Sequence, residues 1–184
     1  VIDEGGSIIH GVMPGLEAPA ALVGIAEKGY VSYALTVRQP GGHSSTPPPQ
    51  SAIGILSAAI AKLEANPFPG GMTGPSKEMF AAFGPEMPFA QRAVFANLWL
   101  FSPLVERMLS GAPETNAIVR TTTAVTMISG GVKDNVLPPE AKAVVNFRIL
   151  PGETYKSVCE RITKIIDDDR VEIAREPPGE GGEC

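Results

Sequence analysis

Few residues in this chain can bind a metal through sulfur or imidazole, because its 184 residues include two cysteines and two histidines. Cys159 and Cys184 form no CxxC pair and have no histidine beside them, which excludes a thiolate zinc site. Aromatic residues make up 6% of the sequence and the formal net charge is −5. Nucleic-acid binding needs clustered Lys and Arg or aromatic stacking platforms, so no nucleic-acid partner is predicted. No apolar run reaches the roughly 20 residues of a membrane-spanning helix, so no membrane partner is predicted either.

The composition is that of a folded protein. Hydrophobic residues account for 43% of the chain and its mean hydropathy is +0.09, which is typical of globular rather than disordered chains. The sequence begins with Val1 rather than Met and ends in the loop-like string PPGEGGEC. We therefore expect the chain to be a fragment of a longer protein.

Hydrophobic periodicity predicts four strands and two helices. The clearest strand is 30–37, in which Val31, Tyr33, Leu35 and Val37 share one face. The other predicted elements are, in chain order, a helix at 51–65, strands at 117–128 and 141–150, a helix at 154–167 and a strand at 171–174. This order predicts an α+β fold, a ferredoxin-like four-stranded antiparallel sheet with two helices on one face.

Residues 67–114 differ from the rest in being dense in Met, Phe, Pro and Gly. We predict that they form a helical insertion between the first helix and the second strand. Short helices are expected near 77–83, 88–100 and 102–110.

Two short motifs place reactive side chains beside glycines. In DEGG, Asp3 and Glu4 precede glycines that free the backbone, and a carboxylate on a tight turn suits zinc. The alternative is a solvated acidic turn, since one Glu cannot make a zinc site.

In GGHSSTPP, His43 follows a strand and precedes three prolines, so a stiff loop presents its imidazole, which can donate a hydrogen bond to a developing oxyanion. The alternative is a surface histidine without a role. His10, between Ile9 and Gly11, lacks the flanking glycines and prolines of His43 and is predicted to be structural.

Two further polar residues lie near the second and third strands. Asn135 precedes Pro138 and Pro139 in the loop KDNVLPPE. Arg148 lies in VVNFRIL, on the face opposite Val145 and Phe147, where its guanidinium can hold a carboxylate with two parallel bonds. The alternatives for Arg148 are an internal ion pair and a solvated sheet face.

The strings VIDEGG, GGHSSTPP, DNVLPP and NFRILPG, in this order, resemble the co-catalytic zinc peptidases of metallopeptidase family twenty. The chain is most similar to the lid domain of the Gly-X carboxypeptidase, aminoacylase and N-acyl-amino-acid hydrolase group, over essentially its whole length. The resemblance implies that Glu4 is a zinc ligand and that His43 reaches the partner subunit's active site and polarises the scissile carbonyl. It also implies that Asn135 and Arg148 bind substrate, with Arg148 on the free carboxylate, and that the lid sheet pairs across a homodimer.

The family's other catalytic and metal-binding motifs are missing from the sequence: its HxD zinc motif, its bridging Asp, the Glu-Glu pair that contains the general base, and its C-terminal His ligand. The resemblance therefore implies a parent enzyme with two zinc ions per subunit that cleaves peptide or N-acyl amide bonds and releases an amino acid. This fragment alone is expected to be inactive and to retain no zinc. Residues 1–27 are predicted to be a connector from the catalytic domain, 28–176 the lid and dimerisation domain, and 177–184 an exit linker.

Two other functions fit a small α+β domain. One is a stand-alone ferredoxin-like module that binds an amino acid or regulates another protein, and it predicts a chain starting at its own Met. The other is a purely structural dimerisation module, which leaves His43 and Arg148 without a purpose.

Overall fold

The computed structural model describes residues 7–12, 15–72 and 74–176, which group into two compact units. The unit that we call the helical unit draws its described residues from Val1–Lys28, Pro69–Arg120 and Leu150–Gly152. The sheet unit draws its described residues from Gly29–Phe68, Thr121–Ile149 and Glu153–Cys184. The predicted exit linker, 177–184, lies outside the described residues.

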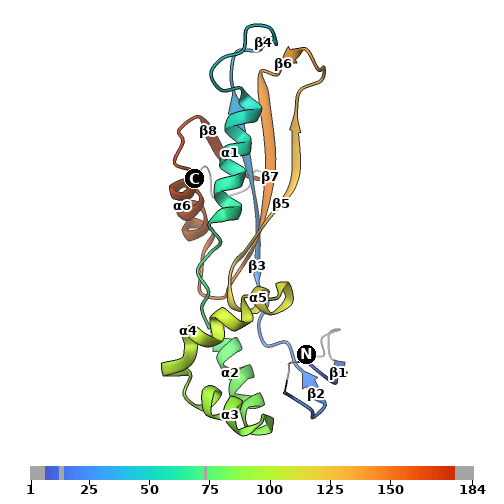
Figure 1. Cartoon of the computed structure of the whole chain (residues 1–184), viewed down its shortest axis with the longest axis vertical. Coiled ribbons are helices and arrows are strands. Elements are labelled where there is room, and N and C mark those ends of the chain that lie inside the picture. Colours follow the sequence, from blue (N-terminus) through green and yellow to red (C-terminus); the bar gives the residue numbers. More distant parts are fainter. Residues whose placement is uncertain (1–6, 13–14, 73, 177–184) are drawn as a thin grey trace. The chain divides into compact units, whose positions relative to one another are not determined.

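The sheet unit is built on a four-stranded antiparallel sheet (Figure 1). Its strands are β3 (Gly29–Arg38), β5 (Thr122–Gly130), β7 (Glu140–Ile149) and β8 (Val171–Glu176), in the spatial order β5-β7-β3-β8. The central pair, β3 and β7, is in register along its whole length, from Gly29 opposite Ile149 to Arg38 opposite Glu140. The predicted α+β fold with a four-stranded antiparallel sheet is confirmed.

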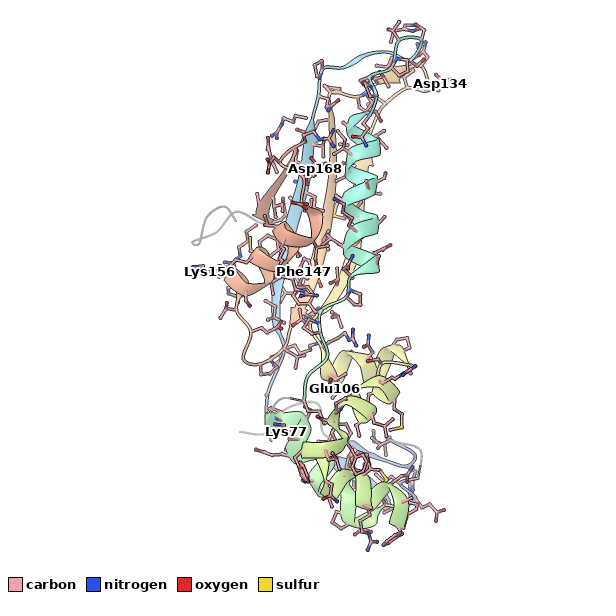
Figure 2. All side chains as sticks on the ribbon, turned by 60° about the vertical axis from the view of Figure 1, so that its left-hand side comes forward. Lys77, Glu106, Asp134, Phe147, Lys156 and Asp168 are labelled. Carbon is pink, nitrogen blue, oxygen red and sulfur yellow. The ribbon has the colours of Figure 1, made fainter. Side chains whose placement is uncertain are left out.

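Helices α1 (Ala52–Ala65) and α6 (Tyr155–Ile166) share one core with the odd-numbered residues of β3 and β7. Phe147, labelled in Figure 2, is fully buried at the centre of this core, where its ring meets those of Tyr33 and Phe68 edge-on at 6.0 and 5.8 Å. Because side chains alternate along a strand, the even-numbered residues of β3 and β7 lie on the other face of the sheet, here called the open face.

Local signals in the sequence fix where these helices begin and end. The Ser51 hydroxyl accepts a hydrogen bond from the backbone N–H of Gly54 and starts α1. Thr154 and Ser157 form a reciprocal capping box at the start of α6. Asp167 ends α6 in the left-handed conformation, with φ of 45°. The predicted helices and the strands at 30–37, 141–150 and 171–174 are confirmed to within about two residues.

The helical unit contains the strands β1 (Ser7–Ile9) and β2 (Ala20–Leu22), which pair with each other, and several short helices. The helices are α2 (Gly74–Phe83), the 3₁₀ turn η1 (Gly84–Glu86), α3 (Phe89–Ala96), α4 (Leu98–Leu109) and α5 (Pro113–Val119). Their core has Phe80 stacked on Phe95 at 5.3 Å, and it also includes Leu16 and Ala20. Among the described residues, none of the helices is both long and apolar enough to cross a membrane.

Two predicted boundaries are wrong. The predicted strand 117–128 begins later, at Thr122, because residues up to Val119 belong to α5. Pro113 starts this helix, and the Lys28 ammonium donates to the carbonyls of Ala117 and Arg120 at its end, at 2.8 and 2.7 Å. The predicted break near residue 101 lies at Asn97, whose side chain donates to the Ala93 carbonyl. The connector at 1–27 and the insertion at 67–114 stay predictions.

Candidate functional site

The loop that contains His43 and the loop that contains Asn135 pair with each other at one end of the sheet unit, where Figure 1 labels β4 (Gly42–His43) and β6 (Val136–Leu137). The short strand β4 pairs with β6, so that His43 lies opposite Val136. The next backbone N–H, that of Ser44, donates to the Asn135 carbonyl at 3.2 Å. The structure thus joins two predicted site residues that are far apart in the sequence. We call this pair of loops the tip, and Asp134, labelled in Figure 2, belongs to it.

A glycine is needed where the two loops of the tip cross. A Cβ atom on Gly41 would lie 3.1 Å from the Leu137 carbonyl oxygen, which is a backbone atom and cannot move aside easily. Gly41 therefore permits the close approach of the β6 backbone that places His43 beside Asn135.

Hydrogen bonds of the tip determine which nitrogen of His43 can donate. The backbone N–H of Ser45 donates to Nδ1 at 3.2 Å, and the Ser45 hydroxyl lies 2.9 Å from the same atom. Because a backbone N–H only donates, Nδ1 must accept, and the neutral imidazole carries its proton on Nε2. The side chain is exposed, so Nε2–H is free to donate to a group outside the described residues. This is the property that oxyanion stabilisation requires.

Arg148 lies on the open face of β7, directly opposite Tyr30 of β3. Its guanidinium stacks on the Tyr30 ring, with 4.9 Å between Cζ and the ring centroid. Within the described part of the chain, no carboxylate forms an ion pair with Arg148. The alternative of an internal ion pair is therefore not observed there, and an aromatic ring holds the cation instead.

Arg148 and the tip lie at opposite ends of the sheet unit. Arg148 is near the end of β7, whereas the tip joins the start of β7 at Glu140 and the end of β3 at Arg38. Since a strand rises about 3.4 Å per residue, Arg148 lies roughly 27 Å from Glu140 along β7. The structure therefore does not bring Arg148 together with His43 and Asn135 within one chain.

A groove of about 570 Å³ runs over the open face, between side chains of β3, β5, β7 and β8. Arg148 and Tyr30 line it, together with Ser32, Asn146 and the ion pair that Lys142 makes with Glu176 at 2.9 Å. Sequence reasoning missed Tyr30, Ser32 and Asn146 as site residues. The signal that could have found them is the strand alternation, which puts polar residues of β3 and β7 on the face of Arg148.

A metal site is not formed by the described residues. None of them gather into a group of three or more His, Cys, Asp or Glu side chains that could hold an ion. Glu4, predicted as a zinc ligand, lies outside the described residues, as does Asp3. The described side chains alone do not fit a zinc ion, which needs at least three protein ligands, so no step below passes through one.

Most of the chain matches a known protein family. Residues 25–173, most of the chain, match the M20 family described as "Peptidase dimerisation domain". The chain belongs to the M20 peptidase dimerisation family. The family predicted from the strings VIDEGG, GGHSSTPP, DNVLPP and NFRILPG is confirmed.

Curated relatives of this M20 domain are much longer than it is. The chain is 47% identical over 175 residues to the "N-fatty-acyl-amino acid synthase/hydrolase PM20D1" of Xenopus tropicalis, covering 95% of this chain and 34% of that protein. It is 44% identical over 176 residues to the "Probable carboxypeptidase S-like 2" of Dictyostelium discoideum, with 95% and 34% covered. The chain thus spans about a third of the length of these relatives. A solved M20 family metallo-carboxypeptidase from Sulfolobus solfataricus is 17% identical, with a TM-score of 0.48, 77% of this chain covered and 40% of that chain.

Proposed function

We propose that this M20 domain is the lid and dimerisation domain of a zinc-dependent hydrolase that cleaves N-acyl amide or peptide bonds and releases an amino acid. The names of its relatives, an N-fatty-acyl-amino acid hydrolase and a carboxypeptidase, support this reaction class. Both relatives are about three times as long as the chain, which supports a catalytic portion elsewhere in the whole protein. Glu4 is proposed as one ligand of its zinc site.

The observation that carries the proposal is the distance between the tip and Arg148. In an N-acyl amino acid, three covalent bonds separate the scissile carbonyl carbon from the carboxylate carbon, a span of less than about 4.5 Å. Roughly 27 Å along the sheet separates Arg148 from the tip, so one subunit cannot offer both groups to the same substrate. We infer that each active site takes Arg148 from its own subunit and the tip from the partner subunit.

The proposed roles follow from the chemistry of each side chain. Arg148 binds the free carboxylate of the substrate, because a guanidinium presents two parallel donors to two oxygens. The Nε2–H of His43 donates to the carbonyl oxygen as negative charge develops on it. Asn135, beside His43 at the tip, contacts the substrate on the same side.

The exposed edge of β5 is proposed as the dimer interface. β5 is an outer strand of the sheet, and Met127 and Ile128 on it are 66% and 63% exposed. Ile53, near the start of α1, lies beside the end of β5, since a Cβ atom on Gly130 would be 3.2 Å from it. The neighbouring exposed surface of α1 includes Gly54, Ser57, Ala58 and Ala61, which let a second helix approach closely. An unprotected strand edge beside such a surface favours pairing around a two-fold axis.

The same proposal covers the finer description of the fold. The order β5-β7-β3-β8, with helices after β3 and β7, supports a ferredoxin-like sheet. We propose residues 28–176 as the lid domain, 67–114 as an insertion in it, and 1–27 and 177–184 as its connections to the catalytic portion.

Complementation between two variants of the whole protein tests the trans arrangement. The His43→Ala and Arg148→Ala subunits are each expected to be weakly active alone, measured as kcat/KM on an N-acyl amino acid. In a mixed dimer, the His43→Ala subunit has an intact Arg148 and receives an intact tip, so one of the two sites is complete. An equal mixture that reassorts freely is therefore expected to recover about a quarter of the wild-type activity.

A mixture of His43→Ala with Asn135→Ala is the matched control, since both changes lie at the tip and no site receives an intact one. Recovery in this control, or none in the first mixture although native mass spectrometry shows mixed dimers, contradicts the trans arrangement.

The interface on β5 is tested by Ile128→Asp. Burying an unpaired carboxylate in the interface is costly, so the dimer dissociation constant is expected to rise roughly 100-fold. Light scattering over a concentration series measures it. Phe89→Asp is the control, because Phe89 is an apolar residue of the helical unit that is 85% exposed. Equal effects of the two changes count against β5 as the interface.

A further inference from the structure

Tyr30 is held in the groove by a chain of hydrogen bonds on the open face. The Asn146 amide donates from Nδ2 to the Val31 carbonyl at 3.4 Å and to the Ser32 hydroxyl at 3.1 Å. A carbonyl only accepts, so the contact with Val31 fixes which end of the Asn146 amide is the nitrogen. Asn146 therefore acts as a donor toward Ser32.

Ser32 in turn donates a hydrogen bond to Tyr30. With its oxygen accepting from Asn146, the buried Ser32 hydroxyl directs its own proton to the Tyr30 oxygen, 3.3 Å away. The Tyr30 oxygen is thus an acceptor in this contact and keeps its O–H for another partner. Within the described residues, no group accepts that proton. A series of aligned hydrogen bonds of this kind strengthens the donor at its end.

The same tyrosine also holds Arg148. The guanidinium lies over the Tyr30 ring at 4.9 Å, and both side chains line the groove. The carboxylate of Glu176 in this groove is paired with Lys142 at 2.9 Å. The groove therefore offers a cation and a neutral O–H, which are in contact through the Tyr30 ring, to an anionic group.

We propose that Tyr30 and Arg148 together form the anchor for the free carboxylate of the substrate. The Tyr30 O–H donates to one carboxylate oxygen while the Arg148 guanidinium, kept in place by the ring, donates to the other. Ser32 and Asn146 are positioning residues that act through Tyr30. This inference rests on the proposed function and adds a second binding residue, which selects a free acid over an amide because both donors face the anion.

Tyr30→Phe in the whole protein tests the anchor, since phenylalanine keeps the ring under Arg148 and removes only the O–H. The KM for an N-acyl amino acid is expected to rise about 10-fold, because a hydrogen bond to a charged group is lost. The kcat should stay nearly constant, since the carboxylate is bound equally in ground and transition states. For the matching N-acyl amino-acid amide, KM should change less than about twofold.

Tyr155→Phe is the matched control. The Tyr155 ring also stacks with an arginine, since Cζ of Arg175 lies 4.6 Å from the ring centroid. Tyr155 belongs to α6, however, and does not line the groove. Its KM values are expected to equal those of the wild type. A rise in KM for acid and amide alike in Tyr30→Phe, or an equal rise in Tyr155→Phe, overturns the anchor.

Direct binding gives a readout that needs no catalysis. The ¹⁵N-labelled 184-residue chain is titrated with N-acetylglycine and with N-acetylglycinamide. The acid is expected to shift the backbone signals of Tyr30 and Asn146 and the side-chain signal of Arg148 in a saturable way, whereas the amide is expected to cause no saturable shift. In Tyr30→Phe, the dissociation constant of the acid is expected to be about 10-fold higher. Equal shifts by acid and amide, or no saturable shift, overturn the proposal.

Failure of the anchor and failure of the proposed function are distinguishable. If Arg148→Ala raises KM for the acid and Tyr30→Phe does not, Arg148 binds the carboxylate without Tyr30 and only the anchor proposal fails. If the whole protein hydrolyses neither N-acyl amino acids nor peptides, the proposed function fails, and the titration of the chain still decides whether the groove binds carboxylates.

Discussion

Replacing His43 by alanine in the whole protein is expected to lower kcat by about 10²–10³-fold, with the dimer and its metal content unchanged. The expectation follows from the tautomer that the tip imposes. Because Nδ1 accepts from the Ser45 backbone, Nε2–H is the donating end of the ring. In the proposed role, it donates to a carbonyl oxygen as that oxygen gains charge, so its loss is expected to raise the barrier more than it weakens substrate binding.

The change should leave the fold intact, because the His43 side chain is exposed and water can replace it as the acceptor for Ser45. His10→Ala is the control, since His10 is the other histidine of the chain and is also exposed. Turnover is measured at saturating substrate, with metal analysis and light scattering on the same samples. A loss of activity below about fivefold, or a parallel loss of metal, shows that His43 does not act as the proposed donor.

The second large effect concerns the core of the sheet unit. Phe147→Ala is expected to lower the free energy of unfolding of this unit by about 3–5 kcal/mol. Phe147 is 0% exposed, and its ring fills the space between Tyr33 and Phe68 under the helices. Removing it leaves a cavity and breaks two edge-on aromatic contacts.

Native-state hydrogen exchange of the β3 and β7 amides measures this change, because the chain has two units and a single unfolding transition cannot be assumed. Phe89→Ala is the control with the same chemistry. Phe89 is 85% exposed, so its removal should change the protection of the helical unit by less than about 0.5 kcal/mol. Similar losses in the two variants would mean that Phe147 does not hold the core.

Short-range patterns in the sequence predicted most of the sheet unit. Alternation of apolar residues in β3 and helical spacing in α1 and α6 predicted these elements, because each buries one face against the same core. The strings around Glu4, His43, Asn135 and Arg148 predicted the family, and the match over residues 25–173 confirms it. The roles of these four residues stay predictions.

Residues 117–121 show where local pattern failed. Their apolar and β-branched side chains favour a strand, yet Ala117 to Val119 end a helix whose last carbonyls are bound by Lys28. Val119 is fully buried in the core of the helical unit. Contacts with residues distant in sequence cannot be predicted from a short stretch of the chain. These tertiary contacts therefore overrode the strand propensity of residues 117–121.

By itself, the sequence determined the strands and helices of the sheet unit and the family of the domain, since both depend on residues close together in the chain. Only the tertiary structure decided which functional groups meet. It paired the loop of His43 with that of Asn135, set the donating nitrogen of His43, and placed Arg148 on Tyr30 at the far end of the sheet. Strand pairing determines the first and the third, because β4 pairs with β6 and the register of β3 against β7 places Tyr30 opposite Arg148, whereas the donating nitrogen of His43 follows from its contact with the Ser45 backbone in the same loop.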